Sequence, residues 1–95
     1  MTEEERKPFV QRVVRESIKE EDGGDVPVTQ DTSLGPAGLG HACSIRQRYH
    51  PRIAKALKAR GCRMKTVTPA KFCGPEVRRV RDVTKLVLND MECEP

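Results

Sequence analysis

The sequence contains no tryptophan and only three aromatic residues, Phe9, Tyr49 and Phe72. Aromatic side chains bury large areas, so their scarcity predicts a small hydrophobic core. Hydrophobic residues make up 36% of the 95 residues and charged residues 34%. This balance does not demand disorder, but it predicts modest stability and a chain that is disordered in part.

Long apolar runs are also missing. No stretch approaches the roughly 18 consecutive apolar residues that a membrane-spanning helix needs. The first residues, MTEEERKPF, are acidic and include no apolar stretch, unlike a secretory signal. We therefore expect a cytoplasmic or nuclear protein that is not secreted and does not bind a membrane.

Close cysteine pairs are absent, because Cys43, Cys62, Cys73 and Cys93 form no C-x-x-C motif. In a reducing compartment this spacing predicts free, partly buried thiols. Zinc sites usually take ligands in close pairs, and only His41 and Cys43 are close, so we expect no metal and no cofactor. A zinc site built from these cysteines stays an open alternative. Cys73 is the better candidate for a reactive thiol, because it precedes a predicted helix start.

Sequence motifs of catalysis are missing as well. The chain has no Gly-rich phosphate loop followed by Lys and Ser or Thr, and no nucleophile elbow. The acidic cluster of Glu3, Glu4 and Glu5 is typical of a solvated helix start rather than of a carboxylate pair in a cleft. We therefore expect a protein that is not an enzyme.

Apolar residues at three- and four-residue spacing predict three helices. In the first, Thr2 and Glu5 have the form of a capping box, which would start the helix at Thr2. Pro8 suits the first helical position, and we prefer a start there. The apolar stripe of this helix consists of Phe9, Val10, Val13, Val14 and Ile18.

The second predicted helix covers residues 51–61, with Pro51 at its first position and Gly61 as its stop. The third covers residues 75–90 and begins at Pro75, although its β-branched end, VTKLVL, also allows a strand. Five glycines and two prolines in residues 22–42 predict a flexible connection.

The predicted fold class is therefore mostly α, a small three-helix arrangement with a long flexible Gly/Pro linker and partial disorder. We divide the chain into an amphipathic helix over 1–21, a linker over 22–44, a basic helical module over 45–90 and an acidic tail over 91–95.

Acidic residues are missing from the middle of the chain. Residues 46–65, RQRYHPRIAKALKARGCRMK, contain eight Lys or Arg and no Asp or Glu. Residues 46–81 contain twelve bases against one acid, Glu76, whereas residues 1–25 contain eight acids against five bases. Such segregation indicates a polyanion, an acidic protein partner, or a basic block neutralised by the chain's own acidic ends.

Of these three, we favour a nucleic acid, RNA or DNA, because Lys and Arg on one connected face supply most of non-specific phosphate binding. Tyr49 is the aromatic residue that we expect to stack on a base. The predicted nucleic-acid-binding residues are Arg46, Arg48, Arg52, Lys55, Lys58, Arg60, Arg63, Lys65, Arg78, Arg79 and Arg81. The layout of residues 53–80 also resembles a helix-turn-helix with 75–81 as recognition helix, although Pro69 interrupts its second helix.

Two alternatives stay open. The chain could be a protein-interaction adaptor or inhibitor whose amphipathic helices lay a Val/Leu stripe into the groove of an acidic partner. It could also be autoinhibited, with its acidic ends covering the basic block. A regulatory role is compatible with each.

Overall fold

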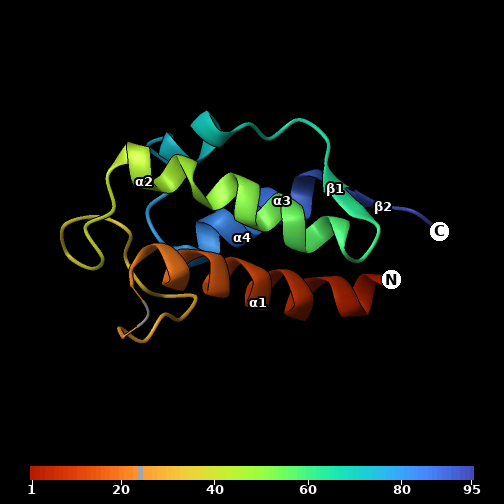
Figure 1. Ribbon diagram of the computed structural model, residues 1–95, viewed down its shortest axis with the longest axis horizontal. Helices are drawn as coiled ribbons and strands as arrows, with labels where there is room; N and C mark the ends of the chain where they lie inside the picture. Colours follow the sequence, from red (N-terminus) through yellow and green to blue (C-terminus); the bar gives the residue numbers. More distant parts are fainter. Residues whose placement is uncertain (24) are drawn as a thin grey trace.

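The computed structural model describes residues 1–23 and 25–95. Its elements, in chain order, are α1 (Glu3–Glu21), α2 (Cys43–Gln47), α3 (Tyr49–Lys58), β1 (Cys62–Met64), the 3-10 helix η1 (Pro69–Cys73), α4 (Val80–Asp90) and β2 (Met91–Cys93). The prediction of a small, mostly helical protein is confirmed. The strands β1 and β2, which were not predicted, pair antiparallel (Figure 1).

The first helix begins at Glu3, so the preferred start at Pro8 is wrong. Thr2 caps the helix, and its hydroxyl accepts a hydrogen bond from the Glu5 backbone NH at 3.3 Å. The Thr2 hydroxyl in turn donates to the Glu5 carboxylate at 3.1 Å. Pro8 removes only the hydrogen bond to the carbonyl of Glu4, which lies on the exposed surface. The cap therefore outweighs the proline.

The helices α1 and α3 lie side by side and run in opposite directions. Glu20 of α1 contacts Arg52 of α3, whereas Phe9 of α1 contacts Arg60, just after α3. The helix α1 also packs against α4, so it supplies one wall of the core (Figure 1). The fully buried core side chains are Val10, Val14, Ile18, Leu34, Tyr49, Ile53, Leu57, Phe72, Val77, Val80, Val83 and Val87.

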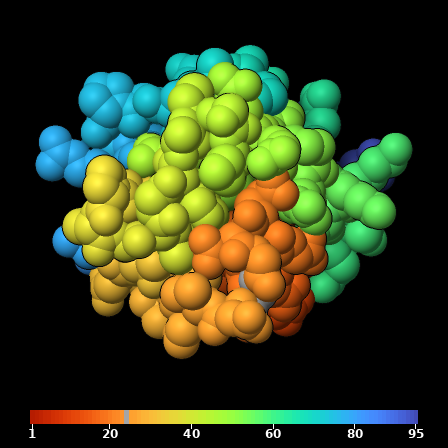
Figure 2. All heavy atoms as spheres, turned by 60° about the vertical axis from the view of Figure 1, so that its left-hand side comes forward, coloured from red at the N-terminus to blue at the C-terminus, as the bar shows by residue number. Residues whose placement is uncertain are grey.

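The predicted linker is packed onto this body, and its flexibility is not confirmed. Leu34 is fully buried, and its backbone NH donates to the Arg78 carbonyl at 2.8 Å. The carbonyls of Thr32 and Gln30 accept hydrogen bonds from the first amides of α4, at 3.0 and 2.8 Å. In Figure 2 this orange-to-yellow segment lies against the rest of the molecule. Residue 24, within the predicted linker, lies outside the described residues.

Glycine in this segment allows close backbone packing. A Cβ added at Gly38 would lie 2.1 Å from the carbonyl oxygen of Ser33, a distance that no side chain can occupy. Gly61 has a φ of 73° in the turn after α3. The helix itself runs from Tyr49 to Lys58 with Ala59 as its C-cap, so the predicted bounds of 51 and 61 are both wrong and Pro51 is not its first residue. A glycine-rich composition therefore reflects tight turns here.

The predicted third helix begins at Val80 rather than at Pro75. The carboxylate of Asp82 accepts hydrogen bonds from the backbone NH groups of Arg78 and Arg79, at 3.0 and 2.9 Å, and so caps the helix. Residues 75–79 are therefore not helical, which contradicts the recognition helix of the helix-turn-helix hypothesis. The sequence VTKLVL is helical, and β2 follows it inside the predicted acidic tail.

Candidate nucleic-acid interface

Glutamates at the end of α1 neutralise the arginines at the beginning of α3. Arg52 donates to the Glu21 carboxylate through Nε and Nη2, at 3.2 and 3.0 Å, and it also bonds Glu20. Arg48 lies 2.8 Å from the other oxygen of Glu21, whose side chain is 8% exposed. We call Arg48, Arg52, Glu20 and Glu21 the paired end. Two predicted phosphate-binding residues are thus already bound to the chain's own carboxylates.

Other predicted residues are also engaged within the chain. Arg63 pairs with Glu92, its Nε lying 2.6 Å from the carboxylate. Arg81 pairs with Asp31 at 2.9 Å, and Arg79 donates to the Asp31 carbonyl at 2.7 Å. These arginines can contact a phosphate only after giving up or sharing their present partners.

Arg46 is turned inward, toward backbone. Its Nε donates to the carbonyl of His41 at 2.9 Å, and its Nη1 donates to the carbonyl of Val77 at 2.8 Å. Arg78 is exposed and donates to the Pro75 carbonyl at 3.3 Å. The structure therefore gives Arg46 a fold-stabilising contact between two segments.

Two exposed arginines meet over Phe9 at the opposite end of the α1–α3 pair, and two exposed lysines of α3 lie between Arg52 and Arg60 in the chain. The guanidinium carbons of Arg60 and Arg12 lie 5.2 and 5.8 Å from the ring centroid of Phe9. Lys55 and Lys58 are exposed on α3; Lys55 lines a shallow pocket with Glu16 and Glu20, and Lys58 lines another with Glu92 and Glu94. Within residues 1–23 and 25–95, none of these four cations forms an ion pair. We call Arg12, Lys55, Lys58 and Arg60 the free basic end.

The sequence prediction missed Arg12, because this residue belongs to the acidic N-terminal region. Its spacing of three residues from Phe9 predicts that the two side chains meet on one helix face. The approach of Arg60 to the same ring depends on the antiparallel packing of α1 and α3, which local spacing does not define. Lys65 is exposed and follows β1.

A buried polar network joins the paired end to the core. His41 is 5% exposed, and its Nε2 lies 2.9 Å from the Asp22 carboxylate. Its Nδ1 meets the hydroxyl of Tyr49. Burial raises the pKa of the Tyr49 phenol, so the hydroxyl keeps its proton. The Nε2 of His41 donates to the Asp22 carboxylate, and in that tautomer of the neutral ring Nδ1 accepts from the Tyr49 hydroxyl. Tyr49 is fully buried and therefore cannot stack on a base as expected.

One carboxylate near β1 is bound by neutral donors instead of by bases. Asp90, the last residue of α4, accepts hydrogen bonds from the Thr66 hydroxyl at 2.6 Å and from the Val67 backbone NH at 2.7 Å. Burial alone would raise the pKa of Asp90, but hydrogen bonds from Thr66 and Val67, together with the charge of Lys65, hold that pKa below its ordinary value. This carboxylate stabilises the turn after β1.

The four cysteines form two disulfides, Cys43–Cys73 and Cys62–Cys93, so the prediction of free thiols is wrong. Their sulfurs are not available to zinc, and the described residues contain no group of three His, Cys, Asp or Glu placed to hold a metal. Cys62 and Cys93 are register partners on β1 and β2, a pairing set by the fold and not by sequence spacing. Disulfides persist mainly in oxidising surroundings, and the cytoplasmic or nuclear location stays a prediction.

The chain matches no known protein family, no curated protein and no solved structure. Within the described residues, no helix combines the length and the apolar character needed to cross a bilayer. The function is therefore inferred from the surface charges and their contacts.

Proposed function

We propose that this protein binds nucleic acid, RNA or DNA, through phosphate contacts made by the free basic end. The observation that carries the proposal is the convergence of Arg12 and Arg60 on Phe9, with the exposed Lys55 and Lys58 on the part of α3 that precedes Arg60. Cations held on one connected face and not neutralised by carboxylates are what phosphate binding requires. The exposed Lys65 and Arg78 add to the positive field.

The contacts within the chain reduce the number of phosphates that we expect the protein to neutralise. Each contact between a basic side chain and a phosphate changes the slope of log affinity against log salt by about −0.9 on duplex DNA. Four contacts therefore predict a slope of about −3.6 and a loss of affinity of about a hundredfold between about 50 and 200 mM salt. Binding of this kind has little sequence specificity, since no exposed aromatic side chain is available in the described residues to stack on a base.

The adaptor alternative receives less support. The Val and Leu stripes that it would use are buried against each other, for example Val10 and Val14 of α1 and Val83 and Val87 of α4. Among the described residues, the exposed large hydrophobic side chain is Val26, at 46%. A partner groove would find no free apolar stripe on these helices.

We propose no catalytic role. Asp22, His41 and Tyr49 are arranged as a carboxylate, an imidazole and a hydroxyl in sequence, which is a pattern also found in hydrolase sites. Tyr49 is fully buried, so its hydroxyl cannot reach a substrate. The network is therefore assigned to stability.

The test is binding to labelled duplex DNA and single-stranded RNA, measured by fluorescence anisotropy at several salt concentrations between about 50 and 200 mM. The double variant Lys58→Gln/Arg60→Gln should lower the magnitude of the salt slope by about two and weaken binding about tenfold at the lowest salt.

The matched control is Lys71→Gln/Lys85→Gln, which removes the same charge from η1 and α4, where both lysines are exposed and form no ion pair in the described part of the chain. It should leave most of the affinity and slope intact. Equal losses in both variants, or no binding by the wild type at the lowest salt, would contradict the proposal.

A further inference from the structure

The two disulfides differ in their access to solvent. Cys43 is exposed whereas Cys62 is 3% exposed and belongs to the hydrophobic core; their partners Cys73 and Cys93 are both half-buried. The sequence separations within the pairs are nearly equal, 30 and 31 residues. The loops that they close therefore constrain the unfolded chain to a similar degree. Cys62 and Cys93 also line an open pocket, of about 980 Å³, but there the carboxylates of Glu92 and Glu94 accompany the cations Lys58 and Arg63. The exposure of Cys43 and the charge of the adjoining pocket are therefore the properties that separate the two bonds.

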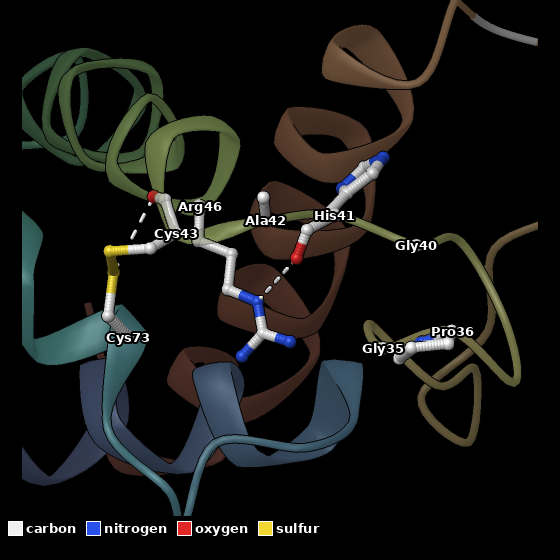
Figure 3. A pocket seen from close by; sticks show the side chains of 8 residues that line it. All are labelled: Gly35, Pro36, Gly40, His41, Ala42, Cys43, Arg46 and Cys73. Carbon is white, nitrogen blue, oxygen red and sulfur yellow. Dashed lines mark hydrogen bonds between the residues drawn. A yellow bond between two sulfur atoms is a disulfide. The ribbon is translucent and has the colours of Figure 1, made fainter.

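The exposed disulfide forms part of the wall of an open pocket of about 410 Å³ (Figure 3). The lining also includes Arg46, Gly35 and Gly40, so the pocket floor is largely backbone with one cation. Arg46 uses Nε and Nη1 for its two bonds to carbonyls, and its Nη2 has no protein partner among the described residues. This pocket therefore places a guanidinium with a free donor next to a disulfide.

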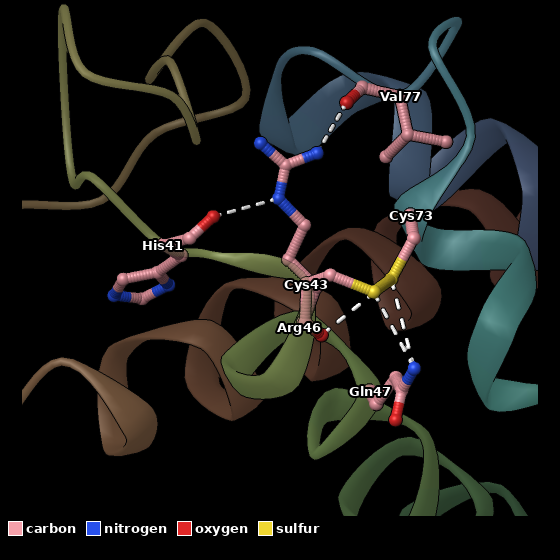
Figure 4. Close-up of a disulfide and its surroundings, with 6 residues drawn as sticks. All are labelled: His41, Cys43, Arg46, Gln47, Cys73 and Val77. Carbon is pink, nitrogen blue, oxygen red and sulfur yellow. Dashed lines mark hydrogen bonds between the residues drawn. A yellow bond between two sulfur atoms is a disulfide. The ribbon is translucent and has the colours of Figure 1, made fainter.

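A neutral donor lies against the sulfur atoms. The side-chain amide Nε2 of Gln47 is 3.4 Å from the sulfur of Cys43 and 4.0 Å from the sulfur of Cys73 (Figure 4). The sulfur of Cys73 instead lies 3.5 Å from the carbonyl oxygen of Cys43, which disfavours a negative charge there. A thiolate on Cys43 is therefore better stabilised than one on Cys73.

From these contacts we propose that Cys43–Cys73 is a site of thiol–disulfide exchange that selects small thiols carrying a carboxylate. The carboxylate pairs with Arg46 in the pocket. The thiolate attacks the sulfur of Cys73, a new bond forms between the two sulfurs, and the Cys43–Cys73 bond breaks with its electron pair leaving on Cys43. A second molecule of the same thiol then attacks the mixed disulfide and releases the oxidised thiol dimer, which balances the two-electron reduction of the protein.

The charge and the size of the pocket both favour small thiols that carry a carboxylate. A pocket of about 410 Å³ is at the small end of the range for small-molecule sites. A cation near the disulfide attracts an anionic thiol and repels an ammonium-bearing thiol, and at water-like screening the two effects together amount to about tenfold in rate. The selectivity should shrink as salt is added.

The experiment uses the intact oxidised protein and three probes, mercaptopropionate, mercaptoethanol and cysteamine, each at the same thiolate concentration. Samples are quenched with acid, alkylated and mapped by mass spectrometry. Cys43 and Cys73 should become labelled before Cys62 and Cys93, and mercaptopropionate should react about ten times faster than cysteamine at Cys43–Cys73. The early mixed disulfide should lie on Cys73, with Cys43 alkylated.

The Cys62–Cys93 bond is an internal reference for the effect of net charge. The rate ratio of mercaptopropionate to cysteamine should be smaller at that bond. In Arg46→Gln this ratio should fall at Cys43–Cys73, whereas Arg46→Lys should keep it. The wild-type comparison does not depend on how well these variants fold. Earlier reaction at Cys62–Cys93, equal rates for the three thiols at Cys43–Cys73, or a mixed disulfide on Cys43 would overturn the proposal.

Discussion

The two ends of the α1–α3 pair carry similar basic sequences but make different contacts. At the paired end, Glu20 and Glu21 hold Arg48 and Arg52, so these arginines contribute to joining the helices. At the free basic end, Arg12 and Arg60 lie over Phe9 without any such carboxylate. A uniform run of bases in the sequence is therefore not a uniform positive surface.

The difference originates in how α1 is charged along its length. Its acids near the C-terminus, Glu20 and Glu21, come opposite the start of α3 because the two helices are antiparallel. The residue of α1 that faces the end of α3 is Phe9, an aromatic ring that attracts cations without neutralising them. The third hypothesis from the sequence, a basic block covered by the chain's own acids, thus agrees with the contacts of Arg48 and Arg52 and with the Arg63–Glu92 pair of the acidic tail, but not with those of Arg12 and Arg60.

The largest effect should come from the buried network of Asp22, His41 and Tyr49, which lies next to the paired end. Tyr49→Phe removes the hydroxyl that meets His41 and leaves a buried imidazole nitrogen without its hydrogen-bond partner. We expect the free energy of unfolding to fall by about 1–3 kcal/mol, measured by urea denaturation with the disulfides intact. Lys58→Gln at the free basic end is the control, and it should change stability by no more than about 0.5 kcal/mol. Equal losses would show that the two ends do not differ in their contribution to folding.

A second variant should convert the paired end into a free one. Glu20→Gln/Glu21→Gln releases Arg48 and Arg52, so nucleic-acid affinity at about 50 mM salt should rise about tenfold, with a salt slope steeper by about two. The measurement is the same anisotropy titration.

The control for this variant is Glu4→Gln/Asp25→Asn, which removes two exposed negative charges that form no ion pair in the described part of the chain. It should raise affinity less and leave the slope nearly unchanged, because it frees no arginine of α3. If both variants gain equally, then net charge alone explains the effect and the paired end covers no phosphate site.

The smallest effect should be the acid sensitivity contributed by Asp90, a carboxylate bound by neutral donors rather than by bases. Its pKa is lowered in the folded chain, so its stabilising effect is present above the unfolded pKa and is lost as pH falls toward the folded value. Asp90→Asn should therefore lower stability at neutral pH, with a difference from wild type that shrinks on acidification. The measurement is the free energy of unfolding of both proteins in urea between about pH 7 and pH 2, a range that spans the ordinary Asp pKa of about 4. A difference that stays constant over this range would contradict it.

Local patterns in the sequence predicted the helical faces well. The apolar spacing of α1 identified Phe9, Val10, Val13, Val14 and Ile18, all of which are buried. Proline rules performed less well, because Pro8 is tolerated near a well-capped helix start and Pro75 lies in a turn before α4. Proline limits backbone geometry, but the capping side chains of Thr2 and Asp82 decide where these helices begin.

Local sequence patterns could not predict the long-range contacts. Nothing in the spacing of four cysteines distinguishes the three ways of pairing them. The buried position of Leu34 and the close approach of Gly38 to Ser33 make the Gly/Pro segment a packed part of the fold, although its composition is that of a linker. The free basic end likewise depends on which residue of α1 lies opposite Arg60.

The order of the disulfides along the chain has a consequence for backbone cleavage. The bond from Cys43 to Cys73 overlaps the bond from Cys62 to Cys93, so every peptide bond between Cys43 and Cys93 is spanned by at least one of them. A single proteolytic cut anywhere in that half of the chain leaves the fragments covalently joined. Such a nicked molecule would migrate as one species on a gel until a reductant separates its pieces.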